Sequence, residues 1–404
     1  MASVITVVGI GADGWTGLPA RLREVVGAAE VVLGGARHLA LLPEIVGQRR
    51  VPWPSPLRDG LADLLAPLDG VRVVALASGD PMVSGIGSVL VDVLGPDRVQ
   101  VEPAISSVTL ARARMGWPTE RTTTVSLVGR GPSTLLRELA PGRRLLVLSA
   151  DETTPGLVAT LLVEEGYGAS VLTVLGDLGT TTETRLAMSA TDWLAAPPAQ
   201  VPRLHVLAVA LAGPRHFGWT TGLPDDAFEH DGQLTKRDLR SSALARLAPV
   251  PGEHLWDVGA GAGSIGIEWM RTHPTCSATA VEADPERAAR VARNAHRLGV
   301  PGLVVVTGRA PAALAGLPAP DAIFVGGGAR EDGLLDHCLA SLAPAGRLVV
   351  HAVTLETEQL LFAAFRQHGG ELTRLSVEVA APIGSFTGWT PARAVTQWAL
   401  TLPS

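Results

Sequence analysis

Short apolar runs alternate with longer Ala- and Leu-rich segments along the whole chain, and this alternation most restricts the possible folds. It is typical of α/β proteins, in which helices cover the faces of a mostly parallel sheet. In the first half the pattern predicts strands near residues 4–10, 30–34, 71–77, 98–101, 123–128, 144–149, 169–175 and 203–212. It predicts helices near residues 18–28, 36–41, 57–66, 84–94, 106–114, 133–139 and 155–165.

A second α/β series follows residues 214–225, a stretch punctuated by Gly and Pro that has no periodicity and is typical of a linker. We therefore expect two domains, residues 1–213 and 226–404. The second series predicts strands near residues 254–259, 277–282, 303–307, 321–325, 346–352, 371–380 and 394–402. It predicts helices near residues 264–272, 285–298, 331–341 and 356–368.

Charge and composition exclude several classes of protein. A net charge of −6 argues against a general nucleic-acid binder, which needs clustered Lys and Arg. Cys276 and Cys338 are too few for a disulfide framework, and no His spacing is typical of a metal site, so we expect no bound metal. No apolar run reaches the roughly 18 residues that span a membrane, and the chain starts with a strand-like segment, so we expect a cytoplasmic protein.

The strand predicted at 254–259 leads into a turn with alternating glycines at Gly259, Gly261 and Gly263 and then into a helix. Glycines let a backbone turn tightly and approach a ligand closely. The next strand ends in Glu282, where a carboxylate can bind both hydroxyls of a ribose. A further strand ends near Ala310, in place for the edge of an adenine. The pattern predicts a nucleoside site, and the alternative is a plain tight turn with a solvated Glu282.

The same turn also fits the G-x-G-x-x-G pattern of dinucleotide sites, which is weak evidence by itself. Its crowded glycines favour S-adenosylmethionine, which has no pyrophosphate, over a nicotinamide cofactor. The amides of the turn can face the methionine carboxylate, and Asp257 can order the loop. A nicotinamide-dependent oxidoreductase stays open as an alternative.

Four blocks in the second half, residues 228–240, 255–266, 321–328 and 353–357, resemble in order the decarboxylating precorrin methyltransferases of cobalamin biosynthesis. The resemblance covers about residues 225–404 and implies a Rossmann-type class I methyltransferase domain. It implies cofactor contacts from Thr235, Gly259, Ala260, Gly261, Ala262, Gly263, Glu282 and Ala310. Lys236, the chain's single lysine, is a candidate catalytic residue or else a surface cation. Three glycines, residues 326–328, predict a flat floor for a large planar substrate.

The first half carries glycine turns of another kind. Residues 9–14 also match G-x-G-x-x-G, but Asp13 would lie where a pyrophosphate should. Residues 78–81 form a polar turn after a strand, and Ser106 is placed as a helix N-cap. In this order the turns resemble the tetrapyrrole methylase family over about residues 1–213. The resemblance implies two α/β subdomains with S-adenosylmethionine between them, contacted by Gly79, Asp80, Met82 and Ser107.

The same resemblance makes Asp13 a candidate catalytic residue that pairs with the substrate. Val128 departs from the family pattern, in which a histidine is expected, so no imidazole can act there. We expect substrate carboxylates to be held by arginines, with seven candidates: Arg112, Arg114, Arg130, Arg237, Arg240, Arg309 and Arg330.

Together the two resemblances imply a bifunctional enzyme with one S-adenosylmethionine per domain. It would methylate a reduced tetrapyrrole at C5 in the first domain and at C15 in the second, and remove CO2 from the ring C acetate. We expect no nucleic-acid or membrane partner and a homo-oligomer. Two further hypotheses stay open: an RNA methyltransferase, and a pair of domains in which one half is a degenerate scaffold.

Overall fold

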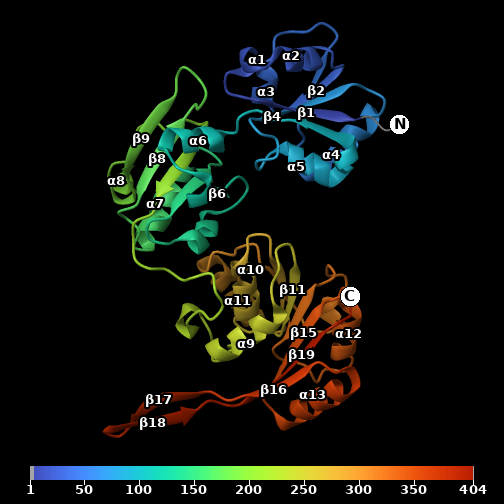
Figure 1. Cartoon of the computed structure of the whole chain (residues 1–404), viewed down its shortest axis with the longest axis vertical. Coiled ribbons are helices and arrows are strands. Elements are labelled where there is room, and N and C mark those ends of the chain that lie inside the picture. Colours follow the sequence, from blue (N-terminus) through green and yellow to red (C-terminus); the bar gives the residue numbers. More distant parts are fainter. Residues whose placement is uncertain (1–3, 404) are drawn as a thin grey trace. The chain divides into compact units, whose positions relative to one another are not determined.

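The computed structural model describes residues 4–403, and the chain folds as two compact units (Figure 1). The first unit contains the described residues up to Pro132 together with 140–215. The second contains residues 133–139 and the described residues from His216 onward. A short segment of the first half of the sequence is therefore part of the second unit.

The first unit begins with a five-stranded parallel sheet in the order β3-β2-β4-β1-β5. Its strands are β1 (Ile5–Ile10), β2 (Val31–Gly34), β3 (Arg49–Pro52), β4 (Val73–Ser78) and β5 (Val99–Glu102). Its helices are α1 (Gly14–Gly17), α2 (Ala20–Gly27), α3 (Ala36–Ala40), α4 (Leu57–Leu65) and α5 (Ile86–Leu94). Alternate residues of β1 enter two different cores, because side chains of a strand point to opposite faces of its sheet.

A second sheet of the first unit has the order β6-β7-β10-β8-β9 and mixes parallel with antiparallel pairs. Its strands are β6 (Thr122–Ser126), β7 (Arg144–Leu148), β8 (Val171–Gly176), β9 (Thr184–Ser189) and β10 (His205–Ala210). The helices are α6 (Ser107–Met115), α7 (Thr154–Glu164) and α8 (Ala190–Ala195). The N-cap prediction at Ser106 is confirmed, since its side chain accepts a hydrogen bond from the Thr109 amide.

The second unit has a seven-stranded sheet in the order β13-β12-β11-β14-β15-β19-β16. Its strands are β11 (His254–Val258), β12 (Ser277–Glu282), β13 (Val304–Thr307), β14 (Ala322–Val325), β15 (Arg347–Ala352), β16 (Glu371–Leu375) and β19 (Val395–Thr401). Strands β11 to β15 are parallel, and β19 runs antiparallel to both of its neighbours. The strand order reverses between β11 and β14, which is where open α/β sheets bind ligands.

Five α-helices cover this sheet: α9 (Arg237–Leu247), α10 (Ser264–Thr272), α11 (Pro285–Arg297), α12 (Leu334–Ser341) and α13 (Leu355–His368). A two-stranded ribbon, β17 (Glu378–Ile383) and β18 (Phe386–Pro391), extends from the sheet (Figure 1). The short 3-10 helices are η1 (Ala66–Leu68), η2 (Pro96–Arg98), η3 (Thr119–Arg121), η4 (Pro132–Glu138), η5 (Asp225–Ala227) and η6 (Ala312–Leu314).

The predicted α/β class is confirmed in both units. The pattern missed β3, β9, β18, α1, α8 and α9, and it merged β16 with β17. The helix predicted at 133–139 is the 3-10 helix η4, and it packs within the second unit. There Trp219 Nε1 donates to the Arg137 carbonyl at 2.9 Å, and a Cβ on Gly299 would lie 2.4 Å from the Arg137 nitrogen.

Candidate functional site

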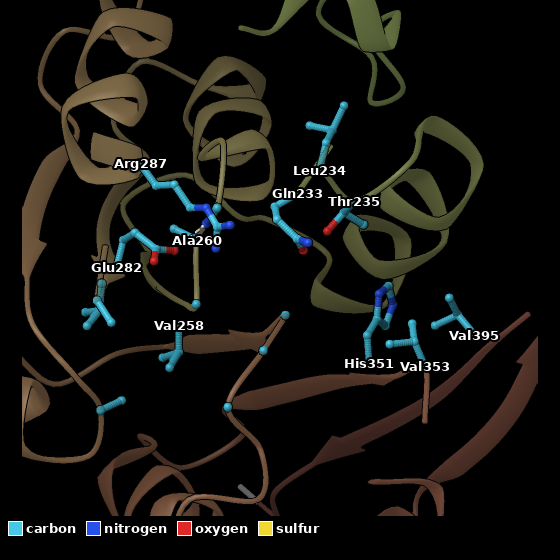
Figure 2. Close-up of a pocket in the computed structure, with 18 of the residues that line it drawn as sticks. Gln233, Leu234, Thr235, Val258, Ala260, Glu282, Arg287, His351, Val353 and Val395 are labelled. Atoms are coloured by element: carbon cyan, nitrogen blue, oxygen red, sulfur yellow. Dashed lines mark hydrogen bonds between the residues drawn. The ribbon is translucent and has the colours of Figure 1, made fainter. Parts of the chain in front are cut away.

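A cavity of about 690 Å³ lies at the carboxyl ends of the parallel strands of the second unit, around the point where the strand order reverses (Figure 2). Its volume falls within the range of small-molecule and cofactor sites. One half is lined by the turn after β11 and the ends of β12 and β13, and the other by residues after β14 and β15. The predicted residues that line it are Thr235, Lys236, Gly259, Ala260, Gly261, Glu282 and Ala310.

The turn after β11 needs glycine at its first position. Gly259 has a φ of +69°, and a Cβ there would lie 2.9 Å from the backbone nitrogen and oxygen of Gly327. The turn after β11 can therefore approach the glycine floor after β14 closely. Ala262 and Gly263 do not line the cavity. Ala262 is buried, and Gly263, the residue before α10, packs against Val291 of α11.

Glu282 joins the end of β12 to this turn. Its Oε2 accepts a hydrogen bond from the Gly261 amide at 2.8 Å, and its Oε1 accepts one from the Asp284 amide at 3.0 Å. Each carboxylate oxygen has a second lone pair, so the side chain can also accept hydrogen bonds from two hydroxyl groups. Glu282 could therefore accept hydrogen bonds from the two hydroxyl groups of a ribose at the cavity wall.

Asp257 lies beneath the turn, at the end of β11. Its Oδ2 accepts a hydrogen bond from the Gly266 amide at 2.9 Å, while its buried Oδ1 has no partner among residues 4–403. Burial raises the pKa of Asp257 to about 7. The carboxyl group thus links the strand to the first turn of α10 and holds the glycine turn from below.

Thr235 and Lys236 form the wall just before α9. The Thr235 carbonyl accepts a hydrogen bond from Arg240 at 2.6 Å, which fixes this segment against the helix. Lys236 Nζ lies 3.7 Å from Asp225 Oδ2, and the lysine side chain is half exposed. Its ammonium group is therefore paired with Asp225 at the edge of the cavity that the lysine lines.

Sequence reasoning missed His351, Val353, Arg393 and Val395, which line the cavity at the ends of β15 and β19. His351 Nε2 lies 2.9 Å from the end of the Gln397 side-chain amide. Burial lowers the pKa of His351 to about 4, so its ring is neutral at pH 7. The place of His351 near the end of a predicted parallel strand was a signal that could have found it.

The first unit has a smaller cavity of about 90 Å³ between its two sheets, lined by Gly11, Gly79, Ser107 and His205 among others. Gly79 has a φ of +53°, and a Cβ there would lie 2.9 Å from the Ile105 carbonyl oxygen. Of the predicted residues, Gly79 and Ser107 line this cavity.

Asp13, Asp80 and Met82 do not line the smaller cavity. Asp13 is exposed at the start of α1, with its carboxylate beside Gly17. Asp80 Oδ1 accepts a hydrogen bond from the Met82 amide at 2.9 Å, and the Met82 side chain is exposed. Asp80 therefore shapes the turn that presents Gly79.

His205 is a second residue that the sequence did not single out. Its Nδ1 lies 2.6 Å from the Pro202 carbonyl, which can only accept, so Nδ1 carries the proton. Nε2 then has a lone pair, and this buried atom has no partner in the described part of the chain. Burial lowers the pKa of His205, so the neutral ring offers the cavity an acceptor.

The structure corrects one arginine candidate. Arg240 is fully buried, with its Nε 2.6 Å from Glu268 Oε1 and its Nη1 3.3 Å from Asp225 Oδ1. Its guanidinium therefore supports the fold and cannot reach a substrate carboxylate. Arg114 is bound by both oxygens of Glu183, whereas Arg309 lines the larger cavity beside Glu331.

Between residues 4 and 403, no three His, Cys, Asp or Glu side chains are grouped so that they could hold a metal ion. Over the same range, no helix has both the length and the apolar character needed to cross a membrane. Cys276 and Cys338 are buried free thiols.

Two family models match the chain. The tetrapyrrole (corrin/porphyrin) methylases match residues 4–192, and the precorrin methyltransferase domain matches residues 226–402. The fold and its sites thus define a methyltransferase composed of a tetrapyrrole methylase and a precorrin methyltransferase domain. The predicted fold class is confirmed.

The chain belongs to the family of precorrin-6Y C(5,15)-methyltransferases (decarboxylating). It is 45% identical over 400 residues to the Sinorhizobium sp protein of that name, covering 98% of this chain and 96% of the relative. A Mycobacterium tuberculosis (strain CDC 1551 / Oshkosh) protein of the same name is 45% identical over 398 residues, covering 98% and 100%. A cobalt-precorrin-6B C(15)-methyltransferase (decarboxylating) from Salmonella typhimurium is 31% identical over 156 residues, covering 38% of this chain and 80% of its own.

Proposed function

We propose that this enzyme methylates precorrin-6Y at C5 and C15 and removes CO2 from the ring C acetate, giving precorrin-8. The observation that carries the proposal is the larger cavity, in which a glycine turn and a strand-end carboxylate face an open glycine floor. The names of relatives 45% identical over 98% of the chain support the same reaction.

The proposal assigns C5 methylation to residues 1–213 and C15 methylation with decarboxylation to residues 226–404. The name of the Salmonella relative carries only the C(15) reaction and it covers 38% of this chain, which fits a C15 activity carried by one of the two domains. Family models that meet the chain in two separate ranges support it as well.

S-adenosylmethionine supplies an activated methyl group on a positive sulfur, and we place one molecule in each domain. In the second domain Glu282 would bind the ribose, the turn at Gly259 to Gly263 would surround the methionine part, and Thr235 and Ala310 would border the remainder. In the first domain Gly79 and Ser107 would contact it, with Asp80 and Met82 shaping the turn. The smaller cavity of about 90 Å³ would hold part of the cofactor, with the remainder outside it.

Catalysis in this scheme rests on placement. A bridge carbon of a reduced tetrapyrrole is itself nucleophilic, so the chain's task is to hold that carbon in line with the methyl group. The glycine floor after β14 gives a planar macrocycle room to approach. Lys236, Arg309 and Arg393 line the cavity and offer positive charge to the carboxylates of the substrate. In the first domain, the exposed Asp13 would pair with the substrate.

Mass analysis of the product tests the proposal. The purified full chain would be incubated with precorrin-6Y and a methyl-labelled donor, and we expect two labelled methyl groups gained and one CO2 lost. Tight binding of a nicotinamide cofactor without any response to S-adenosylhomocysteine would instead support an oxidoreductase. A homo-oligomeric state and a cytoplasmic location stay predictions.

A further inference from the structure

The amide group of Gln397 has one orientation that suits both Arg246 and His351. Arg246 has only N–H donors, so an NH2 group of Gln397 facing it would set donor against donor, whereas the side-chain oxygen can accept. The hydroxyl of Ser242, which also lies next to the Gln397 amide, can donate or accept and suits either orientation. With the amide oxygen facing Arg246, its distances to Nε and Nη1 are 3.1 and 3.3 Å, and the amide nitrogen lies 2.9 Å from His351 Nε2. Gln397 is fully buried on β19, so no solvent competes for either end of its amide.

This orientation fixes which nitrogen of His351 carries the proton. The Gln397 NH2 group donates to His351 Nε2, so Nε2 must present a lone pair, and the proton of the neutral ring lies on Nδ1. The ring edge packs against Phe324, with centroids 5.0 Å apart and an angle of 83° between the planes. His351 lines the cavity, and Figure 2 shows its ring turned toward the side of Thr235.

Two apolar side chains flank His351 on this wall. Val353 and Val395 lie beside the ring in Figure 2, and Leu239 and Leu334 also line the cavity. Burial keeps the ring uncharged at neutral pH, since it lowers the pKa of His351 to about 4. The wall of the cavity therefore includes an uncharged imidazole next to apolar side chains, in addition to the charged groups of Lys236, Arg309 and Arg393.

An uncharged donor suits a carboxylate that must be lost. In decarboxylation the bond between the methylene carbon and the carboxylate breaks, its electron pair moves into the ring system, and CO2 leaves. The ring system accepts this pair because the methyl group added at C15 arrives without its bonding electrons. The methylene carbon then gains a proton from water while the ring system releases one. A cation beside the carboxylate would oppose this loss of charge, whereas a neutral donor orients the group and an apolar wall favours its departure.

We propose that the Nδ1–H of His351 binds and orients the acetate carboxylate that leaves as CO2, and that Arg246 and Gln397 act as positioning residues that set the tautomer of His351. The proposal rests on the proposed function of the second domain.

Two variants of His351 test it in the full-length enzyme. Asn can place an N–H near the position of Nδ1, whereas Phe keeps an aromatic ring without a donor. We expect His351→Phe to slow CO2 loss about 10- to 100-fold relative to C15 methylation, so that a doubly methylated product that still contains the carboxylate accumulates. His351→Asn should release CO2 much faster than His351→Phe, relative to C15 methylation. An unchanged ratio of the two steps, or equal slowing of both, would overturn the proposal.

A second measurement does not depend on turnover. In the 15N-labelled chain, two-bond nitrogen–proton couplings distinguish the two neutral tautomers, and His351→Asn identifies the signal of His351. We expect the Nδ1–H form for His351 at pH 7, and Arg246→Met should produce a mixture and slow CO2 loss several-fold. Finding the Nε2–H form in the unmodified chain would overturn the proposal even if His351→Phe failed to fold.

The proposed function and this inference fail in different ways. If the unmodified enzyme does not gain two methyl groups and lose CO2, the proposed function is wrong. If it does, and the His351 variants release CO2 in step with methylation, only the inference is wrong. Calorimetric titration with S-adenosylhomocysteine should give unchanged affinity for each variant, which separates a substrate role from damage to the cofactor site.

Discussion

The Glu282 carboxylate at the end of β12 accepts a hydrogen bond from the Gly261 amide after β11, with 2.8 Å between oxygen and nitrogen. Two neighbouring strand ends are thereby joined by one charged side chain, and the Asp284 amide holds its other oxygen. This contact organises the part of the cavity where we propose that the ribose of the cofactor binds.

Glu282→Gln should weaken the binding of S-adenosylhomocysteine to the second domain about 10- to 100-fold, measured by calorimetry. A glutamine has one acceptor oxygen instead of two, so an NH2 group would face a backbone amide or a ribose hydroxyl. Glu286→Gln, at an exposed position in the first turn of α11, is the matched control and should have no effect. Equal affinities for both variants would contradict the assignment of Glu282.

Gly79→Ala should remove one of two binding sites for S-adenosylhomocysteine in the full chain. The new Cβ would lie 2.9 Å from the Ile105 carbonyl at a φ of +53°, so the turn beside the smaller cavity would have to shift. Gly70→Ala introduces a similar strain, at a φ of +81°, with no heavy atom within 4 Å of the Cβ, and should keep both sites. A single site in the unmodified chain would refute one cofactor per domain.

Asp257 should make the stability of the second unit depend on pH. Burial raises the folded-state pKa from 3.8 to about 7, so the folded chain holds this proton more tightly than the unfolded chain. The contribution of Asp257 to the free energy of unfolding is therefore fully present below about pH 4 and is lost as pH rises through 7. Its size is about 2–4 kcal/mol.

Asp257→Asn removes this titration, and the free energy of unfolding should then vary less between about pH 5 and pH 8, as urea denaturation across that range would reveal. Asp238→Asn, at an exposed position on α9, should leave the pH dependence of the original chain intact. If the free energy of unfolding changes with pH equally in both variants, Asp257 does not hold a proton in the folded state.

Arg240→Met should lower the stability of the second unit by about 3–5 kcal/mol, because it leaves the buried carboxylate of Glu268 without its cation. The backbone amides of Gly222 and Leu223 would still donate to Glu268 but cannot neutralise it. Arg330→Met at an exposed position should change stability by less than about 0.5 kcal/mol. Thermal unfolding of the full chain compares the two variants.

Lys236→Met should reduce methylation at C15 about tenfold while leaving the melting temperature unchanged, since exposed ion pairs contribute little to stability. Lys236→Arg keeps the charge and should retain part of the activity, with a raised KM for the precorrin. Full activity of the Met variant would assign Lys236 to the surface. Methyl positions in the product, read by NMR, distinguish C15 from C5.

The sequence predicted local features well because short-range rules determine them. Glycines after a strand, as at Gly259, and an N-cap before a helix, as at Ser106, require only neighbouring residues.

Features that depend on distant partners escaped prediction. Nothing near Arg240 in the sequence distinguishes it from a surface arginine, because its ion-pair partners Asp225 and Glu268 lie 15 and 28 residues away along the chain. His351 belongs to the cavity because β15 ends there, and its hydrogen-bond partner Gln397 lies 46 residues further along the chain. The ribbon β17–β18 carries Phe386 and Trp389 exposed, contrary to the usual burial of apolar side chains.

Residues 133–139 pack with the second unit although they precede much of the first unit in the sequence. The polypeptide therefore crosses from one unit to the other three times. Dividing the chain at any one position cannot give two fragments that each contain a complete unit. A fragment starting at the Gly- and Pro-rich stretch would lack the Arg137 carbonyl that Trp219 binds and the chain that covers Gly299. Residues 216–404 expressed alone would expose the surface that residues 133–139 cover, whereas the full chain keeps this surface covered.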